Sequence, residues 1–90
     1  MTELVVLKRE YSKIFSRPVV VQLGRIDRDR VVLDVRDAAR VLLREWREDS
    51  AERTAAMRAC IAALKGKKPA RVARKAFVDA AKVARVLVEK

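Results

Sequence analysis

A chain of 90 residues suits a single domain, and its 22 Lys and Arg against 12 Asp and Glu leave a net charge of +10. It contains no histidine, so the commonest general base is missing, and with one cysteine it cannot assemble a zinc site. No apolar run approaches the roughly 20 residues that span a bilayer, and we expect no secretion signal at the N-terminus. These features argue against an enzyme and a membrane-spanning protein, and they favour a small basic binding domain.

The positive charge is unevenly distributed along the chain. Residues 1–50 carry a balance of +2, whereas residues 51–90 carry +8, and no acidic residue occurs between Glu52 and Asp79. A field of one sign on half of a small domain attracts anions and raises the rate at which they are encountered. Nucleic acid, acidic proteins and anionic membrane surfaces are all candidate partners, and charge alone does not choose among them.

The N-terminal residues are predicted to form an extension, residues 1–14, in front of one domain over residues 15–90. Within Met1–Ser16 the apolar residues fall at helical spacing, which favours a helix that packs on the domain. These residues are Leu4, Leu7, Tyr11, Ile14 and Phe15. The run Leu4–Leu7 also fits a short buried strand, which is the alternative.

Pro18 opens an extended segment, because its ring fixes φ and biases the preceding residue away from helix. Two β-branched runs, Val19–Leu23 and Val31–Leu33, flank a charged, turn-forming stretch and predict a β-hairpin, with a tighter turn if Ile26 joins the first strand. One face is expected to carry Val19, Val21 and Leu23, and the other Val20 and Gln22. Two strands alone are marginal in water. The hairpin therefore needs a covering helix, a third strand from the N-terminus or the same edge of a second copy.

A first helix is predicted from Asp34, whose carboxylate is a good N-cap, with Asp37 adding favourable charge in the first turn. Its apolar face is expected to carry Val35, Ala38, Ala39, Leu42, Leu43 and Trp46. Its basic face carries Arg36, Arg40, Arg44 and Arg47. Trp46 ends the apolar stripe, where a ring is more often part of the core than a platform for stacking bases.

Two further helices are predicted over Asp49–Glu89, joined at Lys65–Pro69. Asp49 or Ser50 caps the first, Gly66 permits the left-handed conformation that ends it, and Pro69 suits the first turn of the second. The buried face of the first should carry Ala56, Met57, Cys60, Ile61, Ala63 and Leu64. The stripe of the second should carry Val72, Ala73, Ala76, Phe77, Ala80, Ala84, Leu87 and Val88. The fold class is therefore α+β, a β-hairpin followed by three helices.

Spaced residues across these elements match a known pattern. They are Phe15-x-x-Pro18-Val19, Ala38-Ala39-x-x-Leu42-x-x-x-Trp46, Ala56-x-x-x-Cys60-x-x-Ala63-Leu64-x-Gly66 and Ala73-Arg74-x-Ala76-Phe77-x-x-Ala80-Ala81. On these residues the chain resembles, over about Phe15–Val88, the small bacterial family of domains of unknown function numbered nine hundred and eighty-two. The resemblance implies a single αβ domain and brings no established activity, cofactor or catalytic residues.

One cluster of cations stands out as a candidate site. It gathers six basic residues within eleven positions beside a predicted helix N-terminus, where free amides and the helix dipole also favour anions. They are Lys65, Lys67, Lys68, Arg71, Arg74 and Lys75. Phosphate oxygens would suit this cluster, whereas the alternative is a solvated surface that keeps the protein soluble.

Sequence-specific DNA reading by the same helix pair is disfavoured. Lys67 sits where a helix-turn-helix reader needs an apolar residue, and Pro69 lies in the turn. Reading base edges also uses Asn or Gln, and the chain's only residue of either type, Gln22, lies in the predicted hairpin.

The leading hypothesis is a non-catalytic binding module whose basic helix-turn-helix hairpin engages a polyanion such as nucleic acid or an acidic protein. No cofactor, metal or catalytic residue is expected. Cys60 is expected to be a buried, inert thiol, and a single cysteine favours a reducing cytoplasm. The alternative is a self-associating domain, a homodimer for example, or an adaptor that uses the hairpin edge or an alanine-lined helix face.

Overall fold

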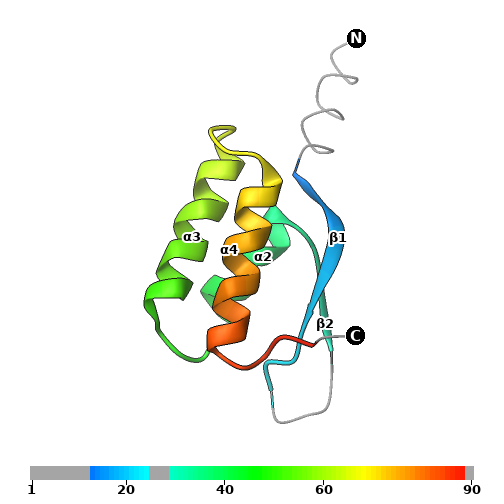
Figure 1. The fold of residues 1–90 in the computed structure, drawn as a ribbon, viewed down its shortest axis with the longest axis vertical. Helices are drawn as coiled ribbons and strands as arrows, with labels where there is room; N and C mark the ends of the chain where they lie inside the picture. The colour runs from blue at the N-terminus through cyan, green and yellow to red at the C-terminus, as the bar shows by residue number, and fades with distance from the viewer. Residues whose placement is uncertain (1–12, 25–28, 89–90) are drawn as a thin grey trace.

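The fold is an antiparallel hairpin followed by three helices, of which the first and the third pack on the strands (Figure 1). The computed structural model describes residues 13–24 and 29–88. The elements are β1 (Ile14–Val21), β2 (Arg30–Asp34), α2 (Val35–Arg44), α3 (Ala51–Leu64) and α4 (Ala70–Val83). None of the helices in these ranges is long and apolar enough to cross a membrane. The predicted α+β class, a hairpin followed by three helices, is confirmed.

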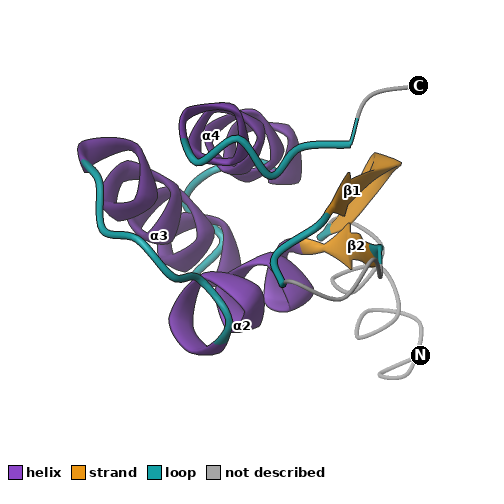
Figure 2. Cartoon of the chain, turned by 90° about the horizontal axis from the view of Figure 1, so that it is seen from below, coloured by secondary structure: helices purple, strands orange, loops and turns teal. Residues whose placement is uncertain are grey.

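The hairpin turns one face to the helices (Figure 2). Val19 lies opposite Val32, and Val21 lies opposite Arg30. Val19, Val21 and Val32 are all buried, as the alternation of the sequence predicts, because neighbouring strand residues point to opposite faces. The prediction that concerned Ile26 falls outside the described residues.

The helix predicted over Met1–Ser16 is wrong for its last three residues, which belong to β1. Ile14 pairs with Asp34, and the amide of Val35 donates to the carbonyl of Lys13 at 3.0 Å. Phe15 is only 5% exposed and joins the core. Pairing with a strand twenty residues away overrides the local helical spacing, since neither pattern nor propensity contains that partner. The remainder of that prediction, residues 1–12, lies outside the described part.

The residues that follow α4 return to the edge of β1 that does not pair with β2. The amide of Gln22 donates to the carbonyl of Val86 at 2.8 Å, and the amide of Val88 donates to the carbonyl of Val20 at 2.9 Å. Val21 lies opposite Leu87 in this antiparallel bridge. β1 is therefore central, with β2 on one edge and residues 86–88 on the other.

The terminal helix is correspondingly shorter than the predicted Pro69–Glu89 and ends at Val83. Arg85 adopts a left-handed φ of 60°. The amide of Val86 then donates to the carbonyl of Ala81 at 3.0 Å, and that of Arg85 donates to Lys82 at 3.1 Å. This pair of bonds is the Schellman arrangement, which closes the helix and redirects the chain. Leu87 and Val88 thus lie on the sheet rather than in a helical stripe.

The helix starts follow the sequence closely. The carboxylate of Asp34 accepts a hydrogen bond from the backbone amide of Asp37 at 2.8 Å. The hydroxyl of Ser50 accepts one from the backbone amide of Arg53 at 2.9 Å. Of the two caps considered for α3, the structure uses Ser50. Gly66 has φ 79° and ends α3, and Pro69 is the N-cap of α4, one position before its first turn.

The core is rich in alanine, but three residues predicted for the apolar faces of the three helices are exposed. Leu43 is 64% exposed, Ile61 45% and Val72 38%. Val41 and Ala81 are fully buried in their place. Each helix packs on more than one neighbouring element, so its buried face is turned toward the space between them, which the sequence of one helix does not reveal.

Trp46 lies just beyond the end of α2 and packs edge-on against Phe77 on α4. Their ring centroids are 5.6 Å apart, with an interplanar angle of 60°. This arrangement is favourable for two aromatic rings and ties the end of α2 to the core. It supports the structural interpretation of Trp46 over a base-stacking one.

Candidate polyanion-binding surface

The turn between α3 and α4 lies at one end of these two helices (Figure 1), and three lysines belong to it. Gly66 takes the left-handed conformation there, and the amide of Lys67 donates to the carbonyl of Ala62 at 2.9 Å. The turn is thus held by its own backbone bonds. Lys65, Lys67 and Lys68 are left exposed around it.

A fourth lysine, from a distant part of the chain, reaches the same place. Lys13, at the start of β1, lines a hollow of about 570 Å³ together with Lys65, Lys67 and Lys68. The rest of its described lining is Ala63, Leu64, Gly66 and Pro69, none of which is acidic. Sequence reasoning missed Lys13 because only the tertiary fold brings the start of β1 beside the turn.

The other three cations of the predicted cluster are directed elsewhere. The Nε of Arg74 donates to the carbonyl of Arg17 on β1 at 2.9 Å. The Nζ of Lys75 lies 3.1 Å from the carboxylate of Asp79, one turn further along α4. Arg71 lies on the outer side of α4 in a shallow groove that it shares with Lys75 and Asp79. The predicted cluster of six is therefore divided, with three lysines at the hollow and three residues along α4.

No acidic residue of the described ranges forms an ion pair with the lysines at the hollow. The ion pairs among described residues are Arg30–Glu45, Arg53–Asp49 and Lys75–Asp79, so none of them neutralises the hollow. Asp34 lines a smaller hollow together with Lys13, and its carboxylate caps α2. Lys65 is the C-cap of α3, where the helix dipole favours a cation.

The one thiol is poorly suited to chemistry. Cys60 is fully buried on α3, and desolvation by burial raises the pKa of its thiol from 9.0 to about 11. The chain has no histidine to remove its proton. A neutral buried thiol behaves as a small apolar side chain, as the sequence analysis expects.

Fold and surface together define a small α+β domain with a basic turn at one end. The chain belongs to the family described as "Protein of unknown function (DUF982)", whose model matches residues 17–88. This confirms the resemblance found in the sequence. Comparison with curated proteins and with solved structures gives no match. The family carries no stated activity, so any function must be argued from the surface itself.

Proposed function

We propose that this domain is a non-catalytic module that binds polyanions, in particular the phosphate backbone of nucleic acid, at the hollow beside the α3–α4 turn. One observation carries the proposal: four lysines from two distant parts of the chain line a single hollow that has no acidic residue in its described lining. Convergent cations raise the local potential beyond that of a scattered basic surface, and this attracts phosphates.

The chemistry of the chain supports binding over catalysis. Lys65, Lys67 and Lys68 are exposed and Lys13 is half-buried. Their ammonium groups are point charges that suit phosphate oxygens without reading base identity. The buried Cys60 and the absence of histidine leave no evident nucleophile and base pair. The expected ligand interaction is therefore electrostatic, independent of sequence and sensitive to salt.

The test is a salt titration of binding to fluorescent duplex and single-stranded oligonucleotides from 50 to 300 mM KCl. We expect the logarithm of affinity to fall linearly with that of salt, since each phosphate contact releases counterions. Lys67→Glu combined with Lys68→Glu should weaken binding by at least about tenfold at 100 mM salt. Lys13→Glu should act in the same direction.

The matched control reverses two exposed arginines away from the hollow, Arg47→Glu with Arg58→Glu. It changes the net charge by the same amount, so equal loss in both pairs would show that only total charge matters and would reject a localised site. Absence of binding at 50 mM salt would reject nucleic acid as the ligand. Anionic vesicles and a poly-glutamate peptide, tested in parallel, identify a different polyanion if one binds instead.

Self-association is a second candidate, favoured by the outer face of the hairpin. Ile14, Val31 and Leu33 are 49%, 45% and 51% exposed there. The strand edges are less available, because residues 86–88 cover one edge of β1 and the amide of Leu33 contacts the carboxylate of Asp37 at 3.5 Å. Light scattering across micromolar concentrations decides the matter, and a strict monomer removes this candidate.

A further inference from the structure

A second cationic groove lies between α4 and the sheet. Its lining includes Arg17 on β1 and Arg74 and Lys82 on α4, and its volume is about 520 Å³. The remaining described residues around it are apolar: Pro18, Val19, Val20, Val78, Leu87 and Val88. The described lining of this groove, like that of the hollow, thus contains cations and no carboxylate.

The hollow and the groove follow the same two elements. β1 and α4 run side by side in the same direction from the turn toward the C-terminal residues (Figure 1). Lys13 faces the hollow with Lys68, and four residues later the carbonyl of Arg17 accepts from Arg74. Lys82 lies two turns beyond Arg74 on the helix, where the groove ends at residues 87–88. Cations therefore occur at successive levels of one seam.

The seam is long enough for several phosphates. Its helical part, from Ala70 to Lys82, is about 18 Å long at a rise of 1.5 Å per residue. This exceeds the axial spacing of about 3.4 Å between phosphates on one strand of a duplex, so more than one phosphate can lie along the seam.

Within residues 13–24 and 29–88, the surface offers no aromatic ring on which a base could stack. Of the aromatic side chains in the described ranges, Phe15 is 5% exposed, Phe77 is fully buried, and Trp46 is packed against Phe77. Proteins that prefer single strands combine a basic groove with exposed rings on which bases stack. Because none of the described rings offers such a platform, the higher charge density of a duplex favours it over a single strand.

Building on the proposed function, we propose that the seam between β1 and α4 binds one backbone strand of duplex nucleic acid, from the hollow at Lys13 and Lys68 to Lys82. A short polyphosphate binds in the hollow alone, whereas a longer ligand also contacts the groove at Arg17 and Lys82. Binding is independent of base sequence and shows a preference for duplex over single strand.

The experiment uses the full chain and fluorescence anisotropy with a labelled 16-base-pair hairpin duplex, a single strand of equal length, and inorganic tripolyphosphate as a short competitor. Three pairs of neutral substitutions are compared: Arg17→Gln with Lys82→Gln at the far end, Lys67→Gln with Lys68→Gln at the hollow, and Arg47→Gln with Arg58→Gln as control. Circular dichroism verifies that each variant is folded. Arg17→Gln keeps the backbone carbonyl that accepts from Arg74, so the packing of β1 on α4 is retained.

For the duplex, the logarithm of affinity falls with the logarithm of salt concentration. The far-end pair should make this slope less steep by about 1.8, since each lost phosphate contact removes about 0.9. It should leave the competition by tripolyphosphate unchanged, whereas the hollow pair should weaken the binding of both the duplex and tripolyphosphate. If the far-end pair behaves like the control while the hollow pair reduces duplex binding, the seam is wrong and the proposed function stands. Tighter binding to the single strand overturns the duplex assignment. No binding of any nucleic acid at 50 mM salt overturns both proposals.

Discussion

Two helices of this domain end in the same way with different residues at the left-handed position. After α3 this position is Gly66, with φ 79°, whereas after α4 it is Arg85, with φ 60°. A residue with a Cβ pays roughly 1–2 kcal/mol for that conformation. The cost at Arg85 is offset by the helix-ending bonds and by the pairing of residues 86–88 with β1.

Arg85→Gly should therefore raise the free energy of unfolding by about 0.5–1 kcal/mol, the strain relieved less the extra entropy of an unfolded glycine. Arg85→Ala is the control, because it removes the same side chain and keeps the strain. Urea denaturation of the three proteins measures the difference. A gain in both variants would mean that the arginine side chain, and not its backbone, is unfavourable.

The buried thiol predicts a pH dependence. Because burial raises the pKa of Cys60 to about 11, the folded state keeps a proton that the unfolded state loses from pH 9.0 upward. The stability from this group is complete below pH 9 and falls between pH 9 and 11, by up to about 1.4 kcal/mol per pH unit. Urea denaturation of the wild type and of Cys60→Ala across this range isolates the contribution of the thiol, because all other groups are common to both proteins. If the stability of both proteins changed with pH in the same way, the predicted contribution of Cys60 would be contradicted.

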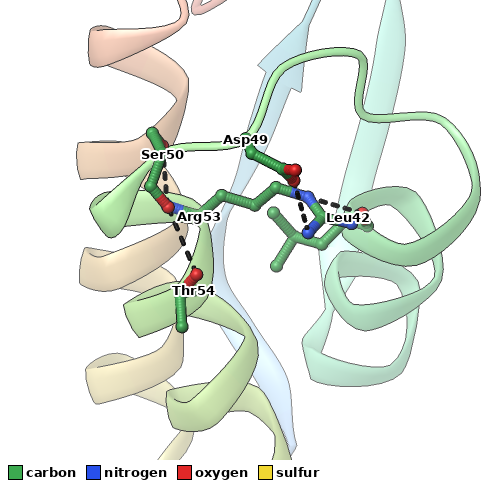
Figure 3. Close-up of polar contacts among 5 residues, drawn as sticks. All are labelled: Leu42, Asp49, Ser50, Arg53 and Thr54. Atoms are coloured by element: carbon green, nitrogen blue, oxygen red, sulfur yellow. Dashed lines mark hydrogen bonds and ion pairs between the residues drawn. The ribbon is translucent and has the colours of Figure 1, made fainter.

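At the scale of elements, one arginine joins α2 to α3 (Figure 3). The Nε and Nη2 of Arg53 donate to the carbonyl of Leu42 at 3.2 and 2.6 Å, and its Nη1 lies 3.2 Å from Asp49. The carbonyl belongs to the last turn of α2, whose final C=O groups have no partner within the helix. Arg53 thus satisfies one helix end from the start of the next.

Replacing Arg53 with Met, which keeps much of its length, should lower the free energy of unfolding by about 1.5–3 kcal/mol, the usual range for a hydrogen bond from a charged group. Asp49→Ala should cost less than about 0.5 kcal/mol, because the side chain of Asp49 is 94% exposed and such ion pairs contribute little. Chemical denaturation of both variants provides the comparison. Equal losses would show that the ion pair, rather than the bond to Leu42, is the important contact.

At the scale of the whole molecule, the last described residues complete the sheet. Val88→Pro removes the amide that donates to Val20 and should reduce stability by about 1–3 kcal/mol. Val88→Ala keeps that amide and should cost less. Hydrogen exchange at Gln22, whose amide donates to Val86, should become faster in the proline variant. Unchanged exchange would mean that the edge pairing does not depend on this bond.

Most of the architecture could be predicted because its signals are local. Asp34 and Ser50 cap helices, Gly66 ends one, and the alternation around Val19 and Val32 marks a strand pair. The errors share one cause. Ile14 becomes strand, and residues 86–88 leave the helix, only through backbone bonds to distant partners. Leu43 is exposed and Val41 is buried because α2 packs against more than one neighbour.

The candidate site divides along the same line. The sequence by itself determined that the Lys65–Pro69 turn is basic and free of neighbouring acids, since both properties are written in consecutive residues. Only the tertiary structure decided which cations share a surface: it added Lys13, turned Arg74 to the carbonyl of Arg17 and paired Lys75 with Asp79. Charge is a property of composition, whereas a binding surface depends on distances between residues that chain folding alone brings together.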